Sequence, residues 1–447
     1  MIYLATLVAA ASTPKTPKPK TPKPKTPKIP KTKSKTKLNK PSKHCQVIGG
    51  HEKAINCIAI DKNNALLLTG SDDHTSQIWE LSTGEKLADL TGHEGYITAV
   101  AFEENEDIYA LTASTDKTVK RWGPLPMNTD EVRTYRPHKT GKINHIEVLG
   151  SIVFTASYDG TIMATELVSG MTIRSFMGHR HSVTTIIVIN IANNIMENIM
   201  ESPELTNYSD AELSQMSFQQ ALDQKTKNWV STNTTTSISQ VFDEQLISCS
   251  ADWTCKVWNV KTAQCIHTLK GHSGAVMALC VDREQVHVFT ASKDSTIRKW
   301  NIRSGHCLHI YEGHEGSVTK ILLDYEGHNN GSFLYSSSMD GTVKSWSTIH
   351  GTNLRTFKCN TIVSTFLKLK DLICVFCGDC TLKVFHSRDG KALGESKTPN
   401  SMIRHVVSTQ GNQLTLAAKK TQLYRENNEK KMNWLKYLID FFLNFFF

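Results

Sequence analysis

The chain has 447 residues, of which 39% are apolar and 21% charged, so most of it can bury a core and is not disordered throughout. Twelve lysines lie between Pro14 and Lys43, and removing them from the net charge of +9 leaves −3. The folded part is therefore near neutral, and global basicity is no evidence that it binds nucleic acid. Eleven scattered cysteines favour reduced thiols in the cytosol or nucleus over a secreted disulfide framework.

The first 43 residues form a separate region. Met1–Ser12 is apolar and similar to a short signal peptide, but it lacks a basic start. Residues 12–43 repeat Pro, Lys and Thr, so we expect a disordered, extended polyproline-II tail. Besides a plain linker, the tail is a candidate for binding nucleic acid, for nuclear localisation, or for presenting Pro-x-x-Pro motifs. We expect a cytoplasmic or nuclear protein, with secretion or membrane association as the minority alternative.

One pattern recurs over residues 44–425. Each copy has a His, an apolar stretch, Ser-x-Asp, and a Trp six residues after the Asp. Successive Asp residues are 43, 43, 93, 42, 46 and 39 apart, and steps of roughly 40–45 residues are typical of a four-stranded propeller blade. Five copies are complete: His51, Ser71, Asp73 and Trp79; His93, Ser114, Asp116 and Trp122; His179, Ser250, Asp252 and Trp258; His272, Ser292, Asp294 and Trp300; and His314, Ser338, Asp340 and Trp346.

Three further copies depart from the pattern. The third keeps His138, Ser157 and Asp159 but has Thr165 in place of Trp. The seventh keeps its Asp and has Asn, Cys and Phe elsewhere, and an eighth is eroded. Their residues are Asn360, Cys377, Asp379 and Phe385 in the seventh, and the strands Ile403–Val407, Leu414–Ala418 and Gln422–Tyr424 in the eighth.

The pairs Gly92-His93, Gly178-His179, Gly271-His272 and Gly313-His314, with their Ser, Asp and Trp partners, resemble the WD40-repeat β-propellers. The order of the repeats resembles uncharacterised eight-repeat animal WD-repeat-containing proteins. The resemblance implies an all-β propeller of eight four-stranded blades, with seven as the alternative. It also implies that the His, Ser, Asp and Trp of one repeat form a hydrogen-bonded structural network. Cys45–Ile48 is the strand expected to pair with the eighth set and close the ring.

The repeated polar residues do not predict catalysis. Ser, His and Asp are the residues of a hydrolytic triad, but six copies at one period indicate a structural network. His-Glu pairs fail as a zinc motif, because Ile55, Ile97 and Val318 stand where the second His is needed. Cys374 and Cys377 would point to opposite faces of a strand, so we expect buried thiols. We predict no catalytic residue, metal, cofactor or small-molecule substrate.

Two segments lie outside the repeat pattern. Residues 190–240 are an insertion between the first two strands of the fourth blade, on the face that the resemblance implies is opposite to the His and Asp loops. Ser209–Leu222 is a candidate short helix within it. Residues 426–447 predict a short apolar helix with a narrow polar stripe, suited to a membrane interface or a partner protein.

The resemblance implies a scaffold that binds proteins or peptides. On the face that carries the His and Asp loops, Tyr96, Tyr158, His181 and Trp253 are the candidate binding residues, unless each ring packs over its own loop. One alternative is a substrate receptor of a cullin–RING ubiquitin ligase, because the run from Trp300 to Arg303 resembles the Trp-Asp-x-Arg adaptor motif with Asn in place of Asp. The other is a nucleic-acid or chromatin factor acting through residues 12–43.

Overall fold

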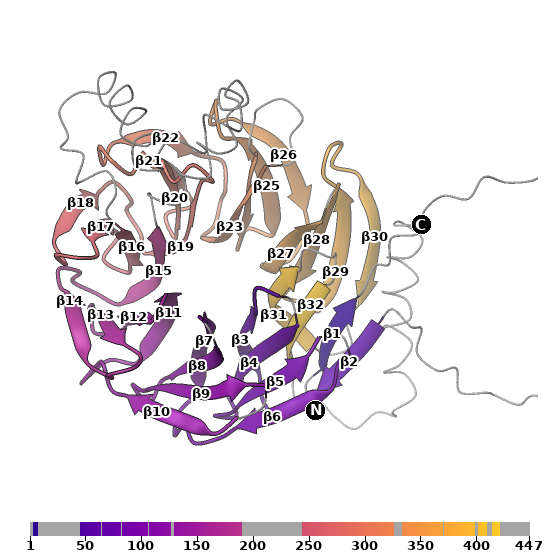
Figure 1. Cartoon of the computed structure of the whole chain (residues 1–447). Helices are drawn as coiled ribbons and strands as arrows, with labels where there is room; N and C mark the ends of the chain where they lie inside the picture. Colours follow the sequence, from indigo (N-terminus) through magenta and orange to yellow (C-terminus); the bar gives the residue numbers. More distant parts are fainter. Residues whose placement is uncertain are drawn as a thin grey trace, which may run out of the picture.

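Seven four-stranded antiparallel sheets follow one another along the chain in the computed structural model, each built from four consecutive strands. The structure describes residues 3–7, 45–63, 65–81, 83–105, 107–126, 129–189, 244–325, 333–369, 371–397, 401–408 and 414–420. We number these seven sheets as blades one to seven in chain order. Figure 1 shows them side by side around a ring, with the first strand of each blade toward the centre and the fourth at the rim.

The strands of blades one to three are β3 (Ile55–Ile60), β4 (Leu66–Ser71), β5 (Ser76–Glu80) and β6 (Lys86–Leu90); β7 (Ile97–Glu104), β8 (Ile108–Ser114), β9 (Val119–Leu125) and β10 (Glu131–Tyr135); and β11 (Ile143–Leu149), β12 (Ile152–Ser157), β13 (Ile162–Glu166) and β14 (Thr172–Phe176). The strands of blades four and five are β15 (Val183–Ile189), β16 (Gln245–Ser250), β17 (Cys255–Asn259) and β18 (Cys265–Leu269); and β19 (Val276–Val281), β20 (His287–Ser292), β21 (Ile297–Asn301) and β22 (Cys307–Tyr311). The strands of blades six and seven are β23 (Val318–Asp324), β24 (Phe333–Ser338), β25 (Thr342–Ser347) and β26 (Asn353–Lys358); and β27 (Val363–Leu369), β28 (Leu372–Cys377), β29 (Thr381–His386) and β30 (Ala392–Lys397).

The core lies between adjacent blades. All six residues of β4 and all six of β16 are buried, because neighbouring blades cover both faces of these second strands. Between blades three and four, Trp258 packs edge-on against Phe176, with their ring centroids 5.8 Å apart. Burying a large apolar side chain contributes about 1.5–3 kcal/mol. Neighbouring blades therefore stabilise one another, as repeated units do when none can bury its own faces.

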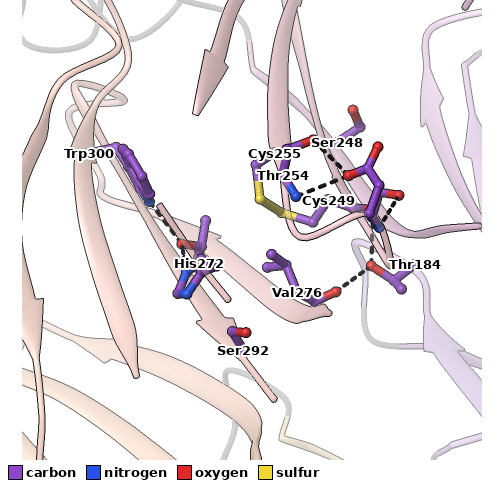
Figure 2. Close-up of a disulfide and its surroundings, with 12 residues drawn as sticks. Thr184, Ser248, Cys249, Thr254, Cys255, His272, Val276, Ser292 and Trp300 are labelled. Atoms are coloured by element: carbon purple, nitrogen blue, oxygen red, sulfur yellow. Dashed lines mark hydrogen bonds between the residues drawn. A yellow bond between two sulfur atoms is a disulfide. The ribbon is translucent and has the colours of Figure 1, made fainter. Parts of the chain in front are cut away.

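Hydrogen bonds also join the inner strands of neighbouring blades. The second residue of each inner strand lies at a β-bulge. Blade five has Met277 at this position, and its side chain is 37% exposed. In blades one to four the side chain donates to a backbone carbonyl of the next inner strand: Asn56 to Ile97 (3.0 Å), Thr98 to Ile143 (2.6 Å), Asn144 to Val183 (2.7 Å) and Thr184 to Val276 (2.8 Å; Figure 2).

A further four-stranded sheet joins strands from the two ends of the described chain, in the order β31 (Ser401–Ser408), β32 (Leu414–Lys420), β1 (Tyr3–Leu7) and β2 (Cys45–Gly49). Cys45–Ile48 lies in the same sheet as the last strands, as expected, but it does not pair with them directly. β1 lies between them, with Leu4 opposite Ala417 and Ile48 opposite Leu4. Aromatic and apolar residues favour strands, so the stretch that resembles a signal peptide is also suited to this position. Gln422–Tyr424 lies outside the described residues.

Cys249 and Cys255 form a disulfide between β16 and β17, where they are register partners (Figure 2). The expectation of reduced thiols throughout is therefore wrong at this pair, because a tight turn brings two cysteines face to face across the ladder. Eight other cysteines in the described part of the chain form no disulfide, and Cys374 and Cys377 are buried. Within that part no three His, Cys, Asp or Glu side chains gather as a metal site would require.

Three predicted segments lie outside the described residues: the 12–43 tail, the 190–240 insertion, and the 426–447 helix. The strands on either side of the insertion pair from Val183 opposite Ser250 to Ile189 opposite Gln245. The insertion therefore joins the strand ends remote from Ser250 and the turn Asp. Within the described ranges, no helix has the length and apolar character needed to cross a membrane.

Candidate functional site

Each of the first six blades brings a His and an Asp together at the same end. The His comes from the loop before the inner strand, and the Asp comes from the turn between the second and third strands. The His Nδ1–H donates to Asp Oδ2 in all six. The pairs are His51–Asp73 (2.8 Å), His93–Asp116 (2.8 Å), His138–Asp159 (3.2 Å), His179–Asp252 (2.8 Å), His272–Asp294 (2.7 Å) and His314–Asp340 (2.8 Å).

A hydroxyl on the second strand continues each chain of hydrogen bonds. In blade two, the Thr112 hydroxyl lies 2.8 Å from His93 Nε2 and accepts the indole N–H of Trp122 at 2.9 Å. An indole only donates and a carboxylate only accepts, so the donors run in one direction from Trp to Asp through a neutral imidazole. The same relay is complete in blades four, five and six, through Ser248, Thr290 and Ser336.

The predicted serine is not the hydroxyl that joins the His ring to the Trp indole. The Ser of Ser-x-Asp lies two residues after the bridging hydroxyl, and in blade two its Oγ accepts the backbone N–H of Asp116 at 3.1 Å. It shapes the turn, as do its equivalents Ser71, Ser157, Ser250, Ser292 and Ser338. The missed hydroxyl had a signal in the sequence, because a Ser or Thr precedes that serine by two positions in six copies. Residues two apart on a strand point to the same face.

Blades one, three and seven are incomplete. Trp79 Nε1 in blade one is buried and has no hydrogen-bond partner among the described residues. Blade three has Thr165 in place of Trp, so the network ends at the hydroxyl of Thr155, 2.9 Å from His138 Nε2. In blade seven, Asp379 accepts the N–H and O–H of Thr381 at 3.1 and 2.6 Å.

The Asp carboxylates are fully occupied. Asp73 accepts hydrogen bonds from the His51 ring, the Glu52 N–H, and both the N–H and hydroxyl of Thr75, at 2.6–3.0 Å. Burial alone would raise the pKa of Asp73, but the hydrogen bonds from His51 and Thr75 outweigh it and hold the pKa well below its usual range. Burial lowers the pKa of His272 and His314, which keeps these rings neutral. Since both ring nitrogens and both carboxylate oxygens have partners, these groups support the loops.

The loops and turns that carry these pairs form one continuous surface, which we call the loop face. The Lys117 ammonium in blade two donates to the Lys139 carbonyl in blade three at 3.3 Å. The turn of blade three lies so close to the next loop that a Cβ added at Gly160 would be 3.2 Å from the His181 carbonyl oxygen. The Ser317 hydroxyl of blade six lies 3.5 Å from the Lys293 carbonyl of blade five.

Exposed aromatic side chains lie on this face. Tyr96 is 49% exposed, Tyr158 62% and Trp253 53%, and His181 is exposed beside the turn that holds Tyr158. Tyr96 makes an edge contact with the His74 ring of blade one at 5.4 Å between centroids, so it partly packs on a neighbouring loop. The structure therefore brings the four predicted residues to the same face, where Tyr158 and Trp253 are more exposed than Tyr96.

Trp253 stands directly after the turn Asp, in the left-handed backbone region with φ of 72°. Ser295 has the equivalent position in blade five with φ of 71°. Any side chain there costs about 1–2 kcal/mol relative to a right-handed conformation, and the turn geometry imposes this position in every blade. The indole of Trp253 is half exposed and is not part of the buried core.

Arg303 lies at the other end of its blade, in the turn between β21 and β22. Its carbonyl accepts the His267 ring N–H at 2.6 Å, which joins blades four and five. Asn301 Oδ1 accepts the backbone N–H groups of Arg303 (3.0 Å) and Ser304 (2.9 Å). The amide oxygen of Asn301 thus supports the turn as an aspartate would.

Comparison with known proteins identifies the repeats. Five segments match the family model of the WD domain, G-beta repeat: residues 42–80, 84–123, 227–259, 263–301 and 305–347. Over 83% of the chain, the fold is similar to the crystal structure of the computationally designed Ika8 protein, with a TM-score of 0.59, 22% identity and 98% of that chain covered. These matches agree with the seven antiparallel sheets of a propeller.

Several relatives match over part of their length. Nuclear distribution protein PAC1 of Saccharomyces cerevisiae (strain YJM789) is 26% identical over 255 residues, which cover 49% of this chain and 51% of PAC1. Mitochondrial division protein 1 of Candida glabrata is 26% identical, over 55% of this chain and 31% of that protein. Human WD repeat-containing protein 37 is 25% identical, over 56% of this chain and 59% of that protein. The chain spans about half the length of PAC1.

Proposed function

We propose that this chain, which has the repeats and sheets of the WD40-repeat β-propeller family, is a non-catalytic scaffold that binds a protein or peptide on its loop face. WD40-repeat proteins generally act as interaction scaffolds, and the observation that supports this site is the pair of exposed aromatics, Tyr158 and Trp253. Aromatic rings that are rigidly held and half exposed are typical of interface hot spots.

The hydrogen-bond network supports binding because it fixes the loops in advance. The turn that presents Trp253 is held by Ser250, Asp252 and Thr254, and Asp252 is held in turn by His179. A partner that meets a preorganised surface loses less affinity to the ordering of loops. The repeated polar quartets therefore act as support for a binding surface.

Affinity purification with two matched variants tests the scaffold. Trp253→Gly removes the indole from a left-handed position where glycine is unstrained, so its effect on stability should stay within about 1 kcal/mol. Ser295→Gly makes the same backbone change in the next blade. We expect proteins captured by the wild type to be lost with Trp253→Gly and retained with Ser295→Gly. Equal capture by all three chains would reject the loop face around Trp253 as the binding site.

A substrate receptor of a cullin–RING ligase is the second candidate. It is favoured by the observation that Asn301 supports the Arg303 turn as Asp would in the adaptor motif. Arg303→Ala should then abolish binding to the ligase adaptor, while Trp253→Gly should leave it intact. Adaptor binding that survives Arg303→Ala would remove this candidate.

The Lys/Pro tail supports a third candidate, association with nucleic acid or chromatin in the nucleus. Deleting residues 12–43 should abolish salt-sensitive DNA binding if the tail neutralises phosphates. Binding that persists would reject it. We also propose residence in the cytoplasm or nucleus, which the eight cysteines without a disulfide support. Imaging of the tagged full chain tests this, and secretion of the tagged chain would contradict it.

We propose further that the ring has eight blades, as in the eight-repeat animal proteins that the sequence resembles. The support is the eighth four-stranded sheet, in which β1 pairs with β32 as the third strand and β2 pairs with β1 as the fourth. Deleting residues 1–49 should then lower the unfolding midpoint of the whole chain, because the ring loses its closing strands. An unchanged midpoint would favour seven blades.

A further inference from the structure

We infer that the partner segment bound by the loop face is an acidic peptide, an inference that rests on the scaffold function proposed above. Exposed cations gather on the loops and turns of blades three to five, the same blades that present Tyr158 and Trp253. Within the described residues none of them forms an ion pair with a carboxylate. They are Arg136, Lys139, Lys142, Arg180, Lys270 and Lys293.

The carboxylates of these blades do not neutralise the cations. Asp252 accepts four hydrogen bonds, from the His179 ring, the Arg180 N–H, and the N–H and hydroxyl of Thr254, at 2.7–3.0 Å. These hydrogen bonds direct its lone pairs into the turn. The exposed lysines and arginines therefore keep their capacity to pair with carboxylates from outside the chain.

The cations and the aromatic rings stand next to each other. The Lys142 ammonium lies 5.6 Å from the ring centroid of Tyr158. Arg180 and Trp253 both adjoin Asp252: the backbone N–H of Arg180 donates to that carboxylate at 2.9 Å, and Trp253 is the next residue along the chain. A peptide with Asp or Glu next to an apolar or aromatic residue would match both features, with its carboxylate on the cation and its apolar side chain on the ring.

The rest of the loop face favours a short acidic segment over a nucleic acid. Exposed carboxylates lie on the loops of blades one, two and six, on either side of the basic blades: Glu52, Glu94, Glu312 and Glu315. A long, uniformly charged phosphate backbone would run into these carboxylates and be repelled. A peptide of a few residues fits between them.

Selection of random dodecapeptides displayed on phage, with the full chain as bait, tests the inference. Selected peptides are then synthesised and their affinity is measured by fluorescence anisotropy at low and at high salt. We expect the peptides to be rich in Asp and Glu beside an aromatic residue, and their binding to weaken with salt. Lys139→Glu combined with Lys142→Glu should weaken binding by about tenfold or more. Lys391→Glu, an exposed lysine between β29 and β30, should leave it unchanged.

Three other outcomes would overturn the inference. Neutral or basic peptides whose binding is lost with Trp253→Gly would contradict the acidic partner while leaving the scaffold function standing. Peptides whose binding survives Trp253→Gly would contradict both. A twenty-nucleotide oligothymidylate that displaces the acidic peptides with higher affinity would identify nucleic acid as the ligand. The thermal unfolding of each variant is measured as a control, to check that the variant remains folded.

Discussion

Replacing Thr112 by Val should destabilise the protein far more than removing the serine two residues later. Val keeps the shape of Thr but removes the hydroxyl, so His93 Nε2 and Trp122 Nε1 both lose their partner in a buried site. Each unpaired buried group costs about 1–3 kcal/mol, so we expect a loss of about 2–6 kcal/mol. Ser114→Ala removes one acceptor, that of the Asp116 N–H, and should cost about 1 kcal/mol.

Blade one provides an internal control for this reasoning. Trp79 Nε1 already lacks a partner there, so Thr69→Val removes the partner of His51 Nε2 and a longer hydrogen bond of 3.3 Å to the Gln77 carbonyl, and should cost about 1–3 kcal/mol. Denaturant titration followed by tryptophan fluorescence measures all three variants. Equal losses for Thr112→Val and Ser114→Ala would refute the bridging role of the threonine hydroxyl. A loss for Thr69→Val as large as that for Thr112→Val would refute the contribution of the indole.

Three further predictions concern stability. Met277→Thr should add a hydrogen bond between the inner strands of blades five and six and raise the free energy of unfolding by about 0.5–1.5 kcal/mol. Thr184→Met should lower the free energy of unfolding by a similar amount. Changes of the opposite sign in the two variants would contradict the role of these contacts. The folded-state pKa values of His272, His314 and the network Asp residues lie below their unfolded values. The stability that the His–Asp networks contribute should therefore be present at neutral pH and decrease as pH falls, first below about 6.5 as the histidines protonate and then below about 4 as the aspartates do. A thermal midpoint that stays constant down to pH 4 would contradict this. Burial raises the pKa of Glu147 to about 7, so at pH 8 the folded protein holds an ionised buried carboxylate. Glu147→Gln should stabilise the protein by up to about 3 kcal/mol at pH 8 but by less than about 1 kcal/mol at pH 5. A gain that does not depend on pH would contradict the burial of this charge.

The sequence predicts the repeated His, Asp and Trp positions because each has a fixed spacing and a distinctive residue type. It does not predict which hydroxyl joins them. Thr112 and Ser114 lie on the same face of β8, and only the position of the His93 ring over the strand decides which one it reaches. The motif emphasises the serine, but the spacing of the two hydroxyl residues was available in every complete copy.

Long-range pairing accounts for the other differences. Counting cysteines does not reveal that Cys249 and Cys255 are opposite each other across a tight turn. An alternating apolar stretch at Tyr3–Leu7 is compatible with a signal peptide and with a strand, and only its pairing with Leu414–Lys420 distinguishes them. The cluster of exposed lysines and arginines on blades three to five likewise forms only when loops far apart in the sequence meet on one face.

Site-specific photocrosslinking tests the central claim most directly. A benzophenone amino acid is placed at Tyr158 on the loop face, or at Ile349, which is 56% exposed in the turn between β25 and β26 at the opposite end of its blade. Irradiation of the full chain with its captured partner should crosslink the partner through position 158 and not through position 349. Crosslinking from position 349 alone would place the partner on the other face and contradict the account.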